Sequence, residues 1–464
     1  MVFSSFTFLL VFLPIVLALY YLIPSVRGKN IVLLAASLLF YAWGEPVYVF
    51  LMLISIAGNY FSVRFMAEEK ARGKKVRPHI AFIVAWNLAM LVFFKYAGML
   101  FGIVNGLFRL NLPGLEISLP IGISFYTFQA LSYGIDVYRG KSEYQKDPFL
   151  FALYISMFPQ LIAGPIVKYG EIEERLAERR VSWKAFGRGA EQFVFGLAKK
   201  VLLANTLGEV FERVSATAAA ERSFAFVWLG ALAFAFQIYF DFSGYSDMAC
   251  GLGKMFGFDF PENFRYPYTA SSVTDFWRRW HISLSSWFRD YVYIPLGGNR
   301  VSVPRHILNL LIVWALTGLW HGASFNFLLW GLYYAVWLIL EKYVLARFAA
   351  KHAVIWRILT LFIVLFGWVL FAFTDFGALG TYLLQMFGIG ASSFIDAPAM
   401  NVLTGNGLAL LAAACCSTVL PVTLYRKIRE KAQAAAVVVQ VLLFIVCIAF
   451  LVYQSYNPFL YFRF

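Results

Sequence analysis

Residues 306–340 read HILNLLIVWALTGLWHGASFNFLLWGLYYAVWLIL, and no Asp, Glu, Lys or Arg interrupts the 35 residues between Arg305 and Glu341. As one continuous α-helix this stretch would be about 52 Å long. The hydrocarbon core of a bilayer is about 30 Å thick. The stretch is therefore too long for one membrane span and too short for two.

A break is predicted near the middle of the stretch. Gly318 and Gly322 flank Trp320 and His321, and glycine tolerates the backbone conformations that end or kink a helix. If the two charged ends lie near one face of the membrane, His321 is carried deep into the protein. Burial disfavours the charged imidazole, so a neutral His321 suits a general base. A packing histidine with both nitrogens bonded is the alternative that spacing leaves open.

The composition of the whole chain is typical of a polytopic membrane protein. Of its 464 residues, 61% are hydrophobic and 14% are charged, against about a quarter charged in soluble domains. The mean hydropathy is +0.71, and 49 Phe, 26 Tyr and 13 Trp supply rings suited to the membrane interface. We expect an all-α integral membrane protein in which residues 1–464 form one domain.

Apolar segments define the candidate spans. They are residues 5–23, 31–44, 47–63, 80–104, 120–137, 148–166, 190–206, 224–240, 306–320, 325–340, 355–373, 406–424 and 434–453. Segments 31–44, 148–166 and 306–320 are short or interrupted by Gly and Pro, which leaves a re-entrant or interfacial position open for them. The last span and the tail that follows occupy residues 434–464.

The distribution of basic residues predicts the orientation. Basic side chains are concentrated in residues 27–29, 64–77, 139–146 and 426–431, which the positive-inside rule places in the cytoplasm. The N-terminus and the C-terminal tail are then extracytoplasmic. Residues 168–188 are rich in Glu, Arg and Lys and predict a cytoplasmic surface helix. Orientation explains the net charge of +14 better than a nucleic-acid or acidic partner does.

Several kinds of chemistry lack a motif in this chain. The four cysteines have no zinc spacing, and we interpret them as reduced and structural. The sequence contains no HExxH, CxxC, GxSxG elbow or Gly-rich nucleotide loop. We therefore predict no metal site and no bound cofactor, and the motifs do not support a serine hydrolase.

A polar block from Asp241 to Ser324 stands out in the apolar chain. Polar groups at membrane depth are costly unless a protein interior or a watery cavity surrounds them, so the block predicts a site. Aromatic residues at spacings of three and four, from 277 to 291, predict one helix with His281 beside its apolar face. Three arginines, Arg278, Arg279 and Arg289, take the opposite side. The alternative is an interfacial helix with a hydrogen-bonded core histidine.

Long motifs in this block make the family recognisable. WRRWHISLSSWFRDYVYIPLGGNR and LTGLWHGASFNFLLWG follow FPQLIAGPIVKY and DFSGYSDMACGLGKMFGF. Together they resemble the membrane-bound O-acyltransferase (MBOAT) family, and within it the bacterial branch typified by the alginate O-acetyltransferase membrane subunit. The resemblance covers nearly the whole chain.

The resemblance implies a fold and two catalytic histidines. The fold would be a ring of about 11–13 transmembrane and re-entrant helices around a thinned centre, where two funnels meet. His321 matches the family's essential histidine in its Trp-His-Gly motif, and His281 matches a second signature position. Trp320 would line the tunnel. The tail motif Phe459-x-Tyr461-x-x-Phe464 resembles one whose tyrosine is thought to carry the acyl group, although an aromatic interface anchor is the other interpretation.

The resemblance also implies substrates and partners. The donor would be acetyl-CoA at the bacterial inner membrane, and an extracytoplasmic serine esterase-fold transferase would pass the acetyl group to a cell-envelope or secreted polysaccharide. Arg278 and Arg279 would attract the phosphates of coenzyme A, unless they are ordinary cytoplasmic charges. Further residues are candidates for the tunnel entrance: Asp241, Ser243, Tyr245 and Asp247. The alternatives are a D-alanyl transferase with a carrier-protein donor and, less favoured, a secondary transporter.

Overall fold

The computed structural model describes residues 1–110, 112–115, 117–454 and 456–460. Every regular element in these residues is a helix, which confirms the all-α fold class. Contacts divide the chain into two compact units: Met1–Phe193 with Ser246–Pro261, and Val194–Tyr245 with Glu262–Phe464. Each unit is described by itself.

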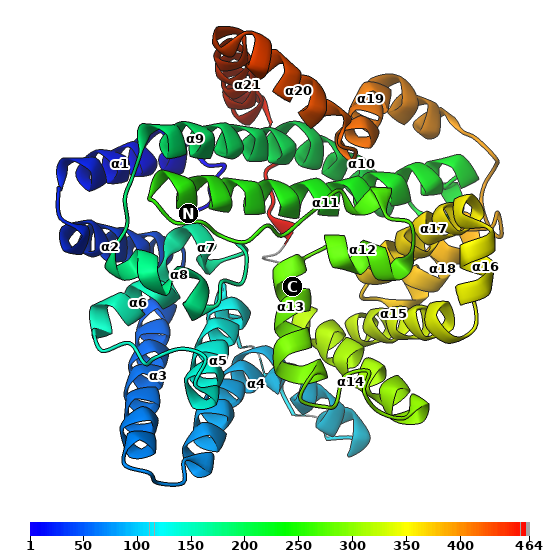
Figure 1. Ribbon diagram of the computed structural model, residues 1–464. Helices are drawn as coiled ribbons and strands as arrows, with labels where there is room; N and C mark the ends of the chain where they lie inside the picture. Colours follow the sequence, from blue (N-terminus) through cyan, green and yellow to red (C-terminus); the bar gives the residue numbers. More distant parts are fainter. Residues whose placement is uncertain (111, 116, 455, 461–464) are drawn as a thin grey trace. The chain divides into compact units, whose positions relative to one another are not determined.

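The first unit contains the helices drawn mostly in blue and cyan in Figure 1. They are η1 (Thr7–Phe12), α1 (Leu13–Leu22), α2 (Val26–Gly44), α3 (Tyr48–Ala71), α4 (Arg77–Leu107), α5 (Ile123–Arg139), α6 (Pro148–Ser156), α7 (Phe158–Leu161), α8 (Tyr169–Ala177) and most of α9 (Trp183–Ala198). Asn59 on α3 and Asn87 on α4 exchange amide hydrogen bonds of 3.1 and 2.6 Å. Because both amides are buried, this exchange satisfies polar groups in an apolar setting.

The second unit holds the rest of the chain. Its helices are η2 (Lys199–Asn205), α10 (Thr206–Ala216), η3 (Ala219–Glu221), α11 (Phe224–Met255, which ends in the first unit), η4 (Pro267–Thr269), α12 (Val273–Arg279), α13 (Ile282–Phe288), η5 (Arg289–Tyr293), α14 (Val303–His321), α15 (Phe325–Tyr343), α16 (Ala346–Lys351), α17 (Ala353–Ala372), α18 (Phe376–Met386), α19 (Ala397–Cys416), α20 (Leu420–Lys431) and α21 (Gln433–Tyr453). Buried aromatic rings dominate its core, with Trp330, Trp368 and Tyr334 each at most 1% exposed.

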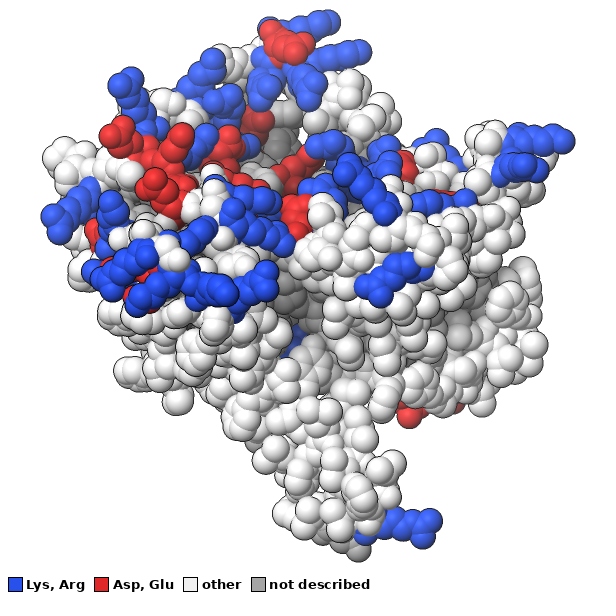
Figure 2. All heavy atoms as spheres, turned by 60° about the horizontal axis from the view of Figure 1, so that its bottom comes forward, with Lys and Arg blue, Asp and Glu red and all other residues white. Residues whose placement is uncertain are grey.

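Among the described residues, seven helices are long and apolar enough to cross a membrane. They are α3 and α4 in the first unit, and α11, α14, α17, α19 and α21. Figure 2 shows that uncharged side chains, drawn in white, make up much of the surface on the face drawn. Length, composition and surface therefore agree with a multi-pass membrane protein.

Two expected helices prove to be broken, and one expected interruption is confirmed. The predicted surface helix 168–188 is wrong as one piece: α8 ends at Ala177 and α9 starts at Trp183. Between them the Arg179 guanidinium donates to Tyr20 Oη at 2.8 Å and to Asn30 Oδ1 at 2.6 Å, contacts that hold this segment out of a helix.

The predicted span 406–424 is likewise divided, because α19 ends at Cys416 and α20 begins at Leu420. The interruption expected in 148–166 lies between α6 and α7.

The break predicted in residues 306–340 is confirmed. α14 ends at His321, and α15 begins at Phe325. His306, near the start of α14, lies 2.7 Å (Nδ1 to Oη) from Tyr343 at the end of α15, so the charged ends of the stretch lie together. A Cβ added to Gly318 would collide with the Phe327 carbonyl oxygen, which shows how closely the two helices approach. His321 therefore lies at the far end of a tight hairpin, drawn in Figure 1 as α14 and α15.

Candidate active site

His321 lies among aromatic rings at the end of α14. Its side chain is buried, with 8% of the residue exposed. The imidazole stands edge-on to Trp320 and Trp330, with ring centroids 5.0 Å away in both cases, and to Phe371 at 5.3 Å. Rings packed on several sides fix the direction in which the imidazole points.

The helix predicted over residues 277–291 is wrong as one piece. α12 and α13 are separated by Trp280 and His281, and His281 has a left-handed backbone with φ 45°. The Asn263 side-chain oxygen accepts hydrogen bonds from Ser283 N at 3.1 Å and from Ser283 Oγ at 2.9 Å. These contacts cap the start of α13 from outside the helix. The backbone therefore turns at His281, and α12 and α13 do not form one continuous helix.

The His281 ring points into the same core as His321. Its Nδ1 lies 3.1 Å from Asn263 Oδ1, and its ring is 4.7 Å from Phe242 and 5.8 Å from Trp320, centroid to centroid. His281 lies outside the seven candidate spans. Burial, and after it the charge of His321, lower the pKa of His281 well below the ordinary value. A neutral imidazole is therefore favoured.

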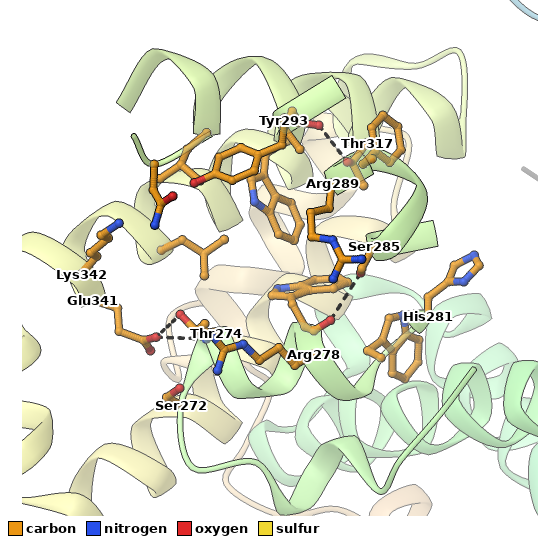
Figure 3. Close-up of a pocket in the computed structure, with 18 of the residues that line it drawn as sticks. Ser272, Thr274, Arg278, His281, Ser285, Arg289, Tyr293, Thr317, Glu341 and Lys342 are labelled. Carbon is orange, nitrogen blue, oxygen red and sulfur yellow. Dashed lines mark hydrogen bonds between the residues drawn. The ribbon is translucent and has the colours of Figure 1, made fainter. Parts of the chain in front are cut away.

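Both histidines line a pocket of about 750 Å³, drawn in Figure 3. Its walls come from α12, α13, η5, the α14–α15 hairpin, α16 and α17. The apolar part is made by large side chains: Trp277, Trp280, Leu284, Phe288, Leu310, Val313, Trp314, Leu338 and Trp356. A cavity of this size and lining has the proportions of a small-molecule or cofactor site, about 300–1,000 Å³.

The charged groups on this pocket are mainly cationic. Arg278, Arg289 and Lys342 line it and are exposed, and Figure 3 draws all three. Glu341 is buried and accepts hydrogen bonds from the first two backbone N–H groups of α12, at 2.8 and 3.0 Å, and from Thr274 Oγ1. Because this carboxylate caps a helix N-terminus, the remaining rim is suited to an anionic ligand.

A second, much smaller cavity adjoins His321. It measures about 20 Å³, and its described lining is Ile238, Asp241, Phe242, Trp280, His321, Trp330, Trp368, Phe371 and Leu460. His321 and Trp280 belong to the lining of both cavities. The imidazole therefore contacts two spaces: a large one with a cationic rim and a small one that is walled mostly by aromatic rings.

The C-terminal tail reaches this small cavity. Leu460 is buried, lines the cavity, and donates its backbone N–H to Asp241 Oδ2 at 2.9 Å. Asp241 forms an ion pair of 2.6 Å with Lys200. Tyr461, the predicted acyl carrier, lies outside the described residues, as does Phe464.

The structure brings together five of the residues predicted from sequence. His281 and His321 line the large pocket with Arg278, Trp320 packs against both imidazoles, and Asp241 lines the small cavity. These five come from three separate parts of the sequence.

Four other candidates line neither cavity. Ser243 is buried, and the Tyr245 ring packs against Phe459 at 4.8 Å. Arg279 forms an ion pair of 2.9 Å with Asp275. Asp247 belongs to the first unit, where its carboxylate accepts from Gln192 Nε2 at 3.2 Å.

Sequence reasoning missed Lys200 and the aromatic walls of the small cavity. Lys200 had a readable signal, because it is an ionisable residue inside the apolar segment 190–206 and such residues mark functional positions in membrane proteins. Trp330, Trp368 and Phe371 had none, since aromatic residues make up 19% of the chain.

Comparisons with known proteins agree with this architecture. Residues 84–385 match the family described as MBOAT, membrane-bound O-acyltransferase family. The Pseudomonas putida protein named "Probable alginate O-acetylase AlgI" is 38% identical over all of both chains. The "Peptidoglycan O-acetyltransferase" of Helicobacter pylori is 34% identical over 74% of this chain and 70% of its own length. The "Teichoic acid D-alanyltransferase" of Bacillus subtilis is more distant, at 27% identity over 47% of this chain and 57% of its own length.

The family match covers more than half of the chain and includes His281, His321 and most of the walls of both cavities. The alginate-branch relative extends the similarity to the whole chain. The chain therefore belongs to the membrane-bound O-acyltransferase family, in the branch of the alginate O-acetylases, and is an O-acyltransferase.

Proposed function

We propose that this protein transfers an acetyl group from cytoplasmic acetyl-CoA across the membrane for O-acetylation of an extracytoplasmic polysaccharide. The observation that carries the proposal is the position of His321, which lines both a large pocket with a cationic rim and a small cavity reached by the C-terminal tail. One imidazole can then serve a donor that enters by one space and an acceptor that enters by the other.

The large pocket is the proposed donor site. Phosphate groups form strong charge-assisted hydrogen bonds with guanidinium and ammonium groups, and Arg278, Arg289 and Lys342 lie on the rim. The pocket's volume of about 750 Å³ suits part of a coenzyme A molecule. Its apolar inner wall leads to His321, where the thioester carbonyl would react.

His321 is the proposed general base. It takes the proton of the acceptor hydroxyl as that oxygen forms a bond to the thioester carbonyl carbon. The carbon–sulfur bond then breaks, and the same proton passes to the departing thiolate, so the products are an acetyl ester and free coenzyme A. His281 stabilises the neighbouring wall through Asn263 and Trp320, and we propose a direct or supporting part for it in this step.

Tyr461 is the proposed first acceptor. The preceding residue, Leu460, lines the small cavity with His321, which supports delivery of Tyr461 to this place. A tyrosyl ester has a phenolate leaving group, with a free pKa of about 10, and so passes its acyl group on more readily than an alkyl ester does. The next acceptor is the serine of an extracytoplasmic esterase-fold transferase, which esterifies the polysaccharide.

The relatives favour a polysaccharide acceptor over the alternatives. Alginate and peptidoglycan, the polymers in the names of the more similar relatives, both contain polysaccharide chains. D-Alanyl transfer from a carrier protein is the second candidate, and the lower identity and coverage of the D-alanyltransferases make it less favoured. A secondary transporter has the least support, since it would need no acyl acceptor at His321.

The test uses purified full-length protein and isotopically labelled acetyl-CoA, followed by mass spectrometry. We expect an acetyl adduct on Tyr461 in the wild type and no adduct in His321→Ala or Tyr461→Phe. Tyr453→Phe is the matched control, because Tyr453 is a highly exposed tyrosine at the end of α21. Equal labelling of wild type, His321→Ala and Tyr461→Phe would contradict the proposal. Labelling by D-alanyl carrier protein alone would favour the second candidate.

A further inference from the structure

Lys200 and Asp241 form a buried ion pair in the second unit. The Lys200 Nζ lies 2.6 Å from Asp241 Oδ1, and the two side chains are 4% and 3% exposed. Removing two charges from water is expensive, and their attraction offsets the cost only when further hydrogen bonds satisfy the remaining atoms. The groups that form hydrogen bonds with Lys200 and Asp241 therefore indicate the role of this ion pair.

Both members of the pair contact the backbone of the C-terminal tail. Lys200 Nζ donates to the Pro458 carbonyl oxygen, and Asp241 Oδ2 accepts the N–H of Leu460 at 2.9 Å. The ammonium group of Lys200 thus contacts a backbone carbonyl of the tail, and the carboxylate of Asp241 contacts a backbone N–H two residues further along the tail. This arrangement recognises the path of the tail's backbone rather than particular side chains.

Other side chains hold the residues on either side. Asn205 Nδ2 lies 3.2 Å from Asn457 Oδ1, and Gln237 Nε2 lies 3.3 Å from the hydroxyl of Tyr456. The ring of Phe459 packs on Tyr245 at 4.8 Å. Each residue from 456 to 460 therefore contacts η2 or α11.

We infer that Lys200 and Asp241 form a docking site for the C-terminal segment 456–460 and hold the end of this segment, Leu460, beside His321. The inference rests on the proposed function and adds positioning residues to it. Asp241 and Leu460 line the small cavity together with His321, so the docking site and the reacting imidazole are adjacent. If the tail leaves, a buried ammonium and carboxylate lose hydrogen-bond partners, and this loss favours its return.

The experiment compares full-length Lys200→Met with the wild type. Hydrogen–deuterium exchange of segment 456–460, acetylation of Tyr461, and release of coenzyme A with hydroxylamine as a small substitute acceptor are measured on each protein. We expect faster exchange in the tail and a fall of about 100-fold in Tyr461 acetylation, because misplacement of a reacting group by about 1 Å has this effect. Hydroxylamine-dependent release should stay within about threefold, since His321 and the donor pocket are intact.

Two further variants separate docking from general stability. Arg222→Met removes another buried cation that donates to backbone carbonyls, at 2.8 and 2.9 Å, but to those of Thr217 and Ser215. It should leave tail exchange and Tyr461 acetylation unchanged. The charge swap Lys200→Asp with Asp241→Lys keeps opposite charges together but presents an anion to the Pro458 carbonyl. It should restore thermal stability relative to Lys200→Met without restoring tail acetylation.

The outcomes distinguish this inference from the proposed function. If the wild type neither acetylates Tyr461 nor releases coenzyme A, the proposed function fails. If the wild type and Lys200→Met acetylate Tyr461 and release coenzyme A equally well, the inference of a docking site is wrong and the proposed function is unaffected. Equal losses of hydroxylamine-dependent release and of tail acetylation in Lys200→Met would also overturn it, because they would indicate a general structural part for the ion pair.

Discussion

Leu460 and His321 line the same cavity of about 20 Å³, although one belongs to the tail and the other ends α14. This relationship brings the last described residue of the chain to the imidazole that the sequence marks as catalytic. It also makes the site sensitive to changes in the helix hairpin, the tail and the aromatic walls, and each can be tested separately.

Replacement of His321 should slow acetyl transfer strongly. Loss of a positioned general base lowers the rate by about 10²- to 10⁴-fold. We therefore expect His321→Ala to lower acetyl-CoA turnover by a factor in this range, with little change in thermal stability. His352→Ala is the control, because His352 lies between α16 and α17 and lines neither cavity. Wild-type turnover in His321→Ala would exclude a catalytic imidazole.

Gly318→Ala should separate α14 from α15. The added methyl group collides with the Phe327 carbonyl oxygen and lies 3.3 Å from the Gly331 Cα, and overpacking of this kind costs about 1–3 kcal/mol. We expect a lower midpoint of thermal unfolding and reduced turnover, because His321 follows Gly318 on the same helix. Gly405→Ala on α19 is the matched control, since its Cβ would meet nothing within 4 Å. Equal stability of the two variants would contradict the close crossing.

His281 should tolerate asparagine better than alanine if its backbone conformation matters most. Its φ of 45° is unfavourable for residues with a Cβ, and Asn adopts this region more readily than Ala. His281→Asn is therefore expected to unfold at a higher temperature than His281→Ala. Acetyl-CoA turnover is then compared at a temperature where both variants are folded. If both variants lose turnover equally, the imidazole has a catalytic part. If His281→Asn retains turnover, the part of His281 is structural.

Neutralising the pocket rim should weaken donor binding. Arg278→Gln, Arg289→Gln and Lys342→Gln each remove a charge that lines the large pocket, and we expect the KM for acetyl-CoA to rise by about fivefold for each with little change in kcat. Added salt should reduce the difference from wild type. Arg279→Gln should raise KM less, because Arg279 lines neither cavity. Equal effects at Arg278 and Arg279 would contradict the assignment of the rim.

Phe371→Ala should widen the range of accepted acyl chains. The small cavity has about the room that one water-sized group needs, which suits the methyl of an acetyl group, and Phe371 forms part of its wall. We expect propionyl-CoA and butyryl-CoA to gain turnover relative to acetyl-CoA in this variant. Phe366→Ala removes the same atoms from α17 without enlarging the cavity and should keep the wild-type preference. An unchanged preference in Phe371→Ala would show that the acyl group lies elsewhere.

Much of the fold could be predicted because its signals are local. The uncharged run 306–340 has a length that fits neither one span nor two, and its glycines mark the break that places His321 at the end of a hairpin. Local signals failed where distant groups compete for the backbone. Asn263 divides the helix expected around His281, and the contacts of Arg179 with Tyr20 and Asn30 divide the one expected over 168–188.

The sequence by itself determined the membrane class, the helical fold, the family and the histidine at the hairpin end, because hydropathy, charge and short motifs are properties of neighbouring residues. Only the tertiary structure decided that Asp241, Leu460 and His321 share a cavity, that Lys200 holds the tail, and that Arg278 faces a pocket while Arg279 does not. Cavities and buried ion pairs arise from packing between segments far apart in the chain, and no local pattern encodes which of many apolar and aromatic residues will form their walls.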